Sequence, residues 1–293
     1  MQGSLWVEAF RSLILGGKPL AAGEVSEAVY ERSPSGPRGL VYAALAVALG
    51  AAVVITAVMG VGALAYLLLL LAPPALFFLW VYRSDRYEPE PGYLVAVAFS
   101  LGIFSGMTVD IVSQAIPLAQ ARYLVEAAVV FLVLLWLASG EFSAEFNDHM
   151  DGLVYGAAVG LGLVTAYNYA YAKLVILAPP TLALLTPAAQ LVAESLLSLS
   201  VVAVTAIAGR WLGWVKALKG SVGLADGLPG LALYAVLRLL YWAAESASTV
   251  LPVNPLPPLL LAAYWAVVWR FTREALRDEM LWGYTAGRAP VER

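Results

Sequence analysis

A few ionisable side chains lie inside long apolar segments of this chain, where charges are costly and usually have a functional reason. They are Asp110, Glu126, Glu194, Arg238 and Glu245. A carboxylate shielded from bulk water can act as a general base, and peptide hydrolysis usually adds a partner acid or a metal ion. An arginine in the same setting needs a carboxylate partner, because a lone guanidinium costs roughly 2.5–3.5 kcal/mol on membrane-insertion scales.

The depth of these groups indicates which of them can meet. A helix rises about 1.5 Å per residue, so Glu194 and Arg238 each lie about 15–18 Å from the end of an expected span, near the midplane. Glu126 and the polar pair Tyr167 and Asn168 lie nearer to the outer surface. We therefore predict that Arg238 faces the bundle interior and pairs with Glu194. Glu126 and Glu245 lie nearer to the outer surface, although the Arg238 side chain can extend towards either. A further alternative is an arginine that reaches a membrane surface or bonds backbone carbonyls.

The segment 148–168 begins with charged residues and continues with apolar and small ones. Gly152, Gly156 and Gly160 recur every four residues. They therefore lie on one side of a helix, where they let another helix approach closely. Tyr167 follows about two turns beyond Gly160 and returns to the same side. Taken alone, this spacing predicts tight helix packing.

The same segment resembles one in the PrsW-type intramembrane proteases, relatives of the larger CAAX-protease and bacteriocin-processing superfamily. The family segment reads roughly D-G-x-x-Y-G-x-x-x-G-x-G-F-A-x-x-E-N. The chain matches it at Asp151, Gly152, Tyr155, Gly156, Gly160, Gly162 and Asn168. Leu163 replaces the family Phe, and Tyr167 replaces its functional Glu. The loop 85–91 also resembles a family hallmark, D-x-x-E-P-E-P, and Phe99 and Gly102 continue it as F-x-x-G.

The resemblance implies a protease site in which glutamates, directly or through a metal ion, activate a water molecule. The first catalytic element of the family reads E-E-x-x-K or E-E-x-x-x-K/R. Here Glu126 supplies one glutamate, Ala127 replaces the other, and apolar residues follow where the family has Lys or Arg. Tyr167 replaces the glutamate of the second element. No histidine precedes the T-A-x-x-G run at 205–209, and Arg238 stands in a histidine position. We therefore expect no bound zinc, no other cofactor and no peptidase activity.

The composition is that of a polytopic membrane protein. Of the 293 residues, 61% are hydrophobic and 13% are charged, which is more apolar surface than a water-soluble fold can bury. The net charge of −3 comes without a basic patch for nucleic acid. The chain has no cysteine and one histidine, which excludes disulfides and Cys/His zinc sites. We interpret His149 as a solvated head-group residue, and the arginine-rich, cysteine-free composition suggests a thermophilic source.

We expect an all-α fold, a polytopic membrane bundle of about eight transmembrane helices with an N-terminal amphipathic interfacial helix. The expected spans are 39–59, 61–82, 92–118, 123–140, 151–173, 182–207, 228–250 and 257–272. The amphipathic stripe comprises Leu5, Trp6, Ala9, Phe10, Leu13 and Ile14, and a short frayed tail is the alternative. Residues 1–38 are then the helix and a polar linker, 39–272 the domain that resembles PrsW proteases, and 273–293 a cytoplasmic tail.

The basic residues predict the orientation. With the N-terminus inside, the inner segments hold nearly all lysines and arginines, and the outer turns hold only Arg122 and Lys173. We therefore predict a cell-membrane protein with both termini in the cytoplasm. The expected cytoplasmic loops are 83–91, 141–150 and 208–227. Trp211 and Trp214 in the last of these are interpreted as interface anchors.

Several functions fit this sequence. The one we favour is a PrsW-like pseudoenzyme, a scaffold that holds transmembrane helices of partner or substrate proteins as a regulator or accessory subunit of a membrane complex. A second is an active intramembrane peptidase with an altered site around Glu126, aided by Glu194 or Asp110. A third is a transporter with a path lined by the buried charges, although the sequence shows no repeated half.

Overall fold

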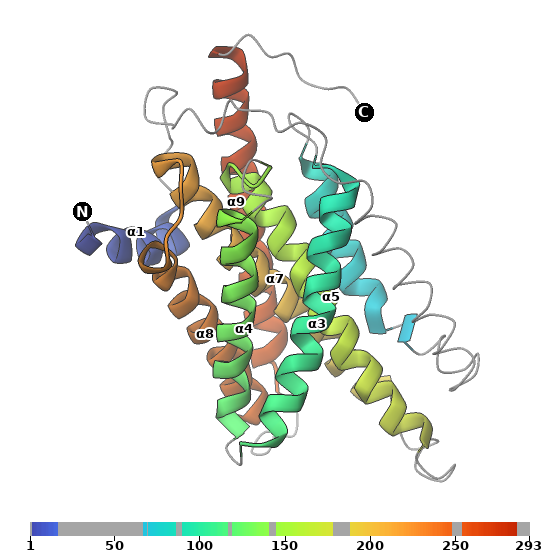
Figure 1. Cartoon of the computed structure of the whole chain (residues 1–293). Coiled ribbons are helices and arrows are strands. Elements are labelled where there is room, and N and C mark those ends of the chain that lie inside the picture. Colours follow the sequence, from blue (N-terminus) through green and yellow to red (C-terminus); the bar gives the residue numbers. More distant parts are fainter. Residues whose placement is uncertain are drawn as a thin grey trace.

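The structure is a computed structural model that describes residues 2–16, 67–68, 70–85, 90–116, 119–140, 145–177, 188–247 and 254–285. All regular secondary structure in these ranges is helical. The helices are α1 (Gln2–Leu15), α3 (Gly92–Gln114), α4 (Ala119–Ser139), α5 (His149–Leu177), α7 (Ala188–Lys219), α8 (Leu224–Ser246) and α9 (Leu256–Thr285), and residues 70–84 are helical as well. They form an elongated bundle, with α1 lying crosswise at its side (Figure 1).

Within the described residues, five helices are long and apolar enough to cross a membrane, namely α3, α4, α5, α7 and α8. With the apolar composition, they make this protein a helical membrane bundle, as the sequence predicts. The expected span 39–59 lies outside the described residues, and 61–82 lies only partly inside them. The helix α9 covers the expected span 257–272 but is not one of the five.

The helix α5 forms the core of the bundle, between α3 and α7 (Figure 1). In its most apolar window 78% of the residues are buried, compared with 33% for α3. A helix that is apolar on every side fits such a position, because it has no polar face to expose. The other helices therefore take their positions from α5.

The glycines of the predicted stripe on α5 all face α7. Added Cβ atoms at Gly152, Gly156 and Gly160 would meet the α7 backbone, and at Gly156 the nearest atom would be the carbonyl oxygen of Thr205 at 2.5 Å. Such a Cβ would push the two helices apart. The stripe therefore lets the backbones of α5 and α7 touch, as in small-xxx-small packing.

A second close contact lies on the opposite side of α5. A Cβ at Gly162 would meet the carbonyl oxygen of Phe99 and lie 2.9 Å from the Cα of Gly102 on α3. In the sequence these two glycines belong to separate family-like motifs, and the structure packs one against the other. Glycine on two sides thus fixes the register of α5 against both neighbouring helices.

The predicted loop at 208–227 is wrong. The helix α7 continues to Lys219, and only residues 220–223 connect it to α8. Gly220 takes a positive φ of 74° there, which glycine adopts easily. The side chains of Trp211 and Trp214 are 2% and 7% exposed, so they pack in the protein core rather than anchoring the helix at a lipid interface.

The basic residues in this stretch stay helical because each finds an acceptor inside the protein. Arg210 pairs with Glu274 of α9 at 3.3 Å, and Lys216 donates a hydrogen bond to the carbonyl oxygen of Ala138 at 2.8 Å. The helix α9 also continues to Thr285, so much of the expected tail 273–293 is helical. Polar contacts across the bundle thus lengthen both helices beyond their apolar segments.

Candidate functional site

Glu126 of α4 lies at the centre of a closed polar cluster. Its Oε1 accepts hydrogen bonds from Arg238 Nε at 2.6 Å and from the Tyr234 hydroxyl at 2.7 Å. Its Oε2 accepts from Arg238 Nη2 at 3.4 Å and from the Tyr167 hydroxyl at 3.1 Å. Glu126 is fully buried. Glu126, Tyr167, Ser200, Tyr234 and Arg238 together are called the Glu126 cluster below.

Four helices supply this cluster. Tyr234 and Arg238 stand four residues apart on α8, so they lie on one face of that helix. Tyr167 comes from α5 and Ser200 from α7, which the glycine contacts hold close together. Arg238 Nη1 also donates to Ser200 Oγ at 3.3 Å. The cluster therefore joins α4, α5, α7 and α8 through one carboxylate and one guanidinium.

The predicted pairing of Arg238 with Glu194 is wrong, because the ion pair forms with Glu126. The helix ends explain the error. Arg238 lies eight residues before Ser246, about 12 Å from the end of α8, and Glu126 lies seven residues after Ala119, about 10 Å into α4. The two thus reach similar depth. Glu194 lies six residues into α7, about 9 Å, so its depth is similar as well. It differs from Glu126 in being partly exposed, whereas Glu126 is buried.

The other predicted polar residues lie outside the Glu126 cluster. Asn168 is buried and pairs with Ser198, donating a hydrogen bond to its hydroxyl at 3.0 Å. Asp110 accepts one from Gln114, a turn later on α3, at 3.3 Å. Glu245 is partly exposed near the end of α8. The predicted site residues Glu126, Tyr167 and Arg238 therefore come together, whereas Asp110, Glu194 and Glu245 do not join them.

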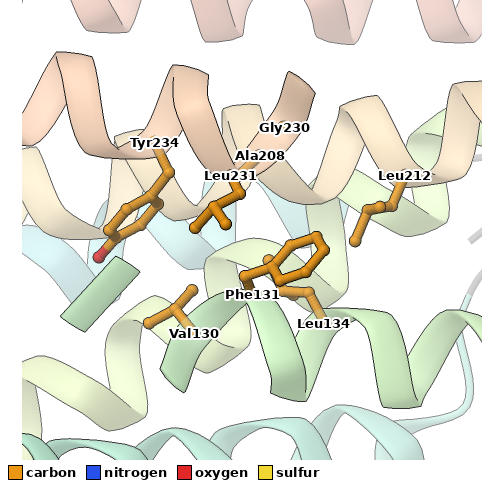
Figure 2. Close-up of a pocket in the computed structure, with 8 residues that line it drawn as sticks. All are labelled: Val130, Phe131, Leu134, Ala208, Leu212, Gly230, Leu231 and Tyr234. Carbon is orange, nitrogen blue, oxygen red and sulfur yellow. The ribbon is translucent and has the colours of Figure 1, made fainter. Parts of the chain in front are cut away.

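A small apolar pocket adjoins the cluster between α4, α7 and α8 (Figure 2). It is lined by Val130, Phe131, Leu134, Ala208, Leu212, Gly230, Leu231 and Tyr234. In Figure 2 the Tyr234 hydroxyl points away from Phe131 and Leu212, and it bonds to Glu126. The pocket thus contributes an apolar wall to the cluster and no further polar group.

A second buried polar region, the acidic corner, lies at the start of α5 and comprises Asp85, Glu90, Asp148, Asp151 and Tyr155. Their exposed fractions range from 1% to 4%. The Tyr155 hydroxyl donates to Glu90 Oε2, and the Glu90 amide donates to Asp85 Oδ2 at 3.0 Å. Burial raises the pKa of Glu90 well above its ordinary value, and the negative charges of Asp85 and Asp148 add to the rise. Glu90 is therefore held in a setting that favours its protonated form.

Backbone amides hold the two aspartates of this corner. Asp148 Oδ1 accepts from the amides of Met150 and Asp151 at 2.6 and 3.1 Å, which makes Asp148 the N-cap of α5. Asp151 Oδ2 accepts in return from the amides of Asn147 and Asp148 at 2.8 and 3.0 Å. Reciprocal bonds of this kind, together with the helix dipole, stabilise carboxylates at a helix start.

The interpretation of His149 as a solvated residue is wrong. Its side chain is 1% exposed and stacks on Trp282 of α9, with ring centroids 5.4 Å apart. Its Nε2 lies 3.9 Å from Asp278 Oδ2. The sequence did not reveal this environment, because α9 was expected to end before Trp282.

The sequence also missed part of the Glu126 cluster. Tyr234 lies one turn before Arg238, which is a usable signal once Arg238 is taken as buried. Ser200 carries no such signal, since serine is common in apolar helices and its role depends on how α7 and α8 pack. Among the residues that the structure describes, no group of three or more His, Asp or Glu side chains is arranged to hold a metal ion.

The fold and the cluster define a helical membrane protein with a closed polar core. Over 113 residues, the chain is 28% identical to the protease PrsW of Bacillus subtilis (strain 168). The match covers 34% of this chain and 50% of that protease, so it spans about half the length of the relative. It supports a distant PrsW-like relationship. No protein-family model matches the chain, and no solved structure is significantly similar to it.

Proposed function

We propose that this protein is a non-catalytic, PrsW-like membrane scaffold that holds transmembrane helices of partner proteins, as a regulator or accessory subunit of a membrane complex. The observation that carries the proposal is the state of Glu126. Both of its carboxylate oxygens accept hydrogen bonds, and its charge is paired with Arg238. A general base needs an oxygen that faces the water it activates. The hydrogen-bond donors to the Glu126 carboxylate are side chains of the same chain, namely Arg238, Tyr234 and Tyr167.

The altered positions support the same proposal. In the family resemblance Tyr167 replaces a functional glutamate, and Arg238 stands in a histidine position. In the structure both side chains bind Glu126, the glutamate that remains. Each change replaces a group suited to proton transfer or metal binding: Arg238 neutralises the charge of Glu126, and Tyr167 donates a hydrogen bond to it. The changes therefore fit together as one structural cluster in place of a reactive site.

Exposed apolar side chains support the helix-holding role. On α3 they include Phe104, Met107 and Ile111, and on α4 they include Leu132 and Trp136. A surface of this kind meets lipid or another transmembrane helix. Under the proposal, part of it contacts the helix of a partner protein.

Peptidase activity and metal content test the catalytic part. The purified protein is reconstituted with peptides that span the bilayer, and cleavage is followed by mass spectrometry beside the double variant Glu126→Gln/Arg238→Met. This variant keeps the site uncharged, so it is a better control than Glu126→Gln alone. We expect equal, background cleavage and no bound metal. Cleavage that depends on Glu126, or one tightly held zinc ion per chain, would favour the peptidase alternative.

Photocrosslinking tests the helix-holding part. A photoreactive amino acid replaces Met107, which is 52% exposed, and Leu153, which is fully buried, serves as the control position. Crosslinking in native membranes should attach a defined transmembrane segment of another protein at Met107 and none at Leu153. Adducts with lipid alone at several exposed positions would contradict a scaffold function.

The orientation of the bundle is also part of the proposal. We infer that both termini face the cytoplasm, because basic residues concentrate on that side of the expected topology. The chain has no native cysteine, so a single Ser143→Cys variant reports on its own loop. This cysteine should react with an impermeant thiol reagent only after the cells are opened. If this cysteine were labelled in intact cells, the orientation would be the reverse of the one proposed.

A further inference from the structure

The helix α1 has an exposed face that is apolar. Ala9 and Ser12 are buried against the bundle, with 0% and 5% of their surfaces exposed. The predicted amphipathic stripe is thus divided, since part of it packs on protein and part of it does not. The exposed large apolar side chains of α1 are Trp6, Val7, Phe10, Ile14 and Leu15. Among the charged residues of α1, Arg11 is exposed and Glu8 is partly exposed.

The bundle holds α1 firmly at its C-terminal end. The guanidinium of Arg270 on α9 donates hydrogen bonds to the carbonyl oxygens of Ser12, Leu13 and Ile14, at 2.7, 2.6 and 3.0 Å. The Ser12 carbonyl also accepts from the Gly16 amide at 3.1 Å, whereas Leu13 and Ile14 belong to the last turn, where carbonyls lack partners within the helix. A cation there also meets the negative end of the helix dipole. Glu274 lies 3.7 Å from Arg270 and steadies the guanidinium. The position of α1 is therefore set by a specific contact.

The orientation of α1 differs from that of the spanning helices. It lies across the bundle, whereas α4, α7 and α8 run along it (Figure 1). It packs beside α8. At the start of α8, Leu224 and Leu228 are also exposed, at 60% and 39%. Exposed apolar side chains thus occur both on α1 and on the helix beside which it packs, in a protein that spans a membrane.

We propose that α1 lies in the interfacial layer of the bilayer, with Trp6, Phe10 and Ile14 among the upper acyl chains. The partner of this face is lipid, because a helix lying in the membrane plane with a large apolar side binds at the boundary between head groups and acyl chains. Trp6 suits that boundary, and Arg11 can extend to the head groups. Because α1 carries Glu8 and Arg11 as its only charged residues, apolar insertion drives the contact rather than attraction to anionic lipid.

Spin labelling in liposomes of phosphatidylcholine tests the lipid contact. The variants Phe10→Cys and Ile14→Cys each carry one nitroxide in the naturally cysteine-free chain. We expect collisions with oxygen, which concentrates in the acyl region, to exceed collisions with a water-soluble nickel chelate. Dominant collisions with the chelate would place the face in water and overturn the proposal. Shielding from both reagents, with spin–spin broadening, would indicate a second copy of this chain and also overturn it.

A matched pair of arginine variants independently tests the contact between Arg270 and the C-terminal end of α1. Arg270→Gln removes the bonds to α1, whereas Arg273→Gln removes the same charge from an exposed residue of α9 that stacks on Trp269. We expect Arg270→Gln to raise the mobility of the nitroxide at position 10 several-fold more than Arg273→Gln does, while oxygen contact persists. Equal mobility in the two variants would show that Arg270 does not set the position of α1.

Discussion

The Glu126 cluster and the acidic corner are both buried and both include residues of α5, yet they stabilise their carboxyl groups by different means. Tyr167 and Asp151 mark the two regions, and they lie sixteen residues apart, or about 24 Å along the helix. Glu126 is paired with the guanidinium of Arg238 at 2.6 Å. In the acidic corner, backbone amides and the Tyr155 hydroxyl donate hydrogen bonds to the carboxyl oxygens, and Glu90 favours its protonated form.

The difference shows which charges this fold can keep inside. A carboxylate deep within a span has no free backbone amides near it, because the helix uses them all. It therefore needs a side-chain cation. At a helix start, the first amides are unpaired and can hold an aspartate without one. Whether a carboxyl group lies deep within a span or at a helix start thus decides the kind of partner it needs. The two regions should therefore respond differently to mutation and to pH.

The largest effect is expected from breaking the ion pair. Arg238→Met leaves Glu126 charged and unpaired in the bundle, and Glu126→Gln does the same to Arg238. Each variant should lose about 3–5 kcal/mol of unfolding free energy, measured by denaturation in mild detergent. The double variant should lose much less than the sum of the two, because neither charge is then left alone.

Two controls make this test specific. Arg122→Met removes a partly exposed arginine that stacks on Tyr167 at 4.6 Å, and it should have a small effect. The double variant Glu194→Gln/Arg238→Met tests the pairing that the sequence predicted. If its two single effects failed to add while those of Glu126 and Arg238 did add, the assignment of the ion pair would be wrong.

A smaller effect is expected from the glycine contact that positions α5 for both polar regions. In Gly156→Ala the new methyl group meets the Thr205 carbonyl oxygen and the Cα of Ala206 at 2.9 Å. Separating α5 from α7 should cost about 1–3 kcal/mol, as overpacking of a core usually does. Gly92→Ala is the control, since no atom lies within 4 Å of its added Cβ. Equal melting temperatures for the two variants would contradict the close packing of α5 on α7.

The apolar runs were enough to predict the helical membrane fold. They located α3, α4, α5 and α8 well, because twenty apolar residues in sequence have few alternatives to a spanning helix. Where α7 and α9 end was not predictable in the same way. Both helices continue into charged sequence, and only contacts such as Arg210 with Glu274 reveal why.

The candidate site was predicted in part. Family resemblance pointed to Glu126, Tyr167 and Arg238, which the structure brings together. Glu194 was predicted as the partner of Arg238 because depth was counted from the expected span ends. The span that contains Glu126 was expected to begin at residue 123, but α4 begins at Ala119, so Glu126 lies deeper than predicted. The acidic corner was missed as a unit, because Glu90 and Asp151 come from segments far apart in sequence and meet only in the folded chain.

The smallest effect, and the one that separates the two regions most directly, is the pH dependence at Glu90. Burial raises the pKa of Glu90 well above its ordinary value. In the unfolded chain this glutamic acid loses its proton near pH 4.3. Its contribution to stability is therefore fully present below that pH and declines as the pH rises through the raised pKa of the folded protein. Glu90→Gln keeps a neutral side chain at every pH, so it should match the parent protein near pH 4 and become progressively more stable than the parent at higher pH.

The measurement is a series of melting temperatures from pH 4 to 9 for the parent protein and for Glu90→Gln. The difference between Glu90→Gln and the parent should widen as the pH rises. A difference that narrows as the pH rises would mean that Glu90 is held as a carboxylate, as Glu126 is. The two regions would then stabilise their acids in the same way, and the contrast drawn from their partners would fail.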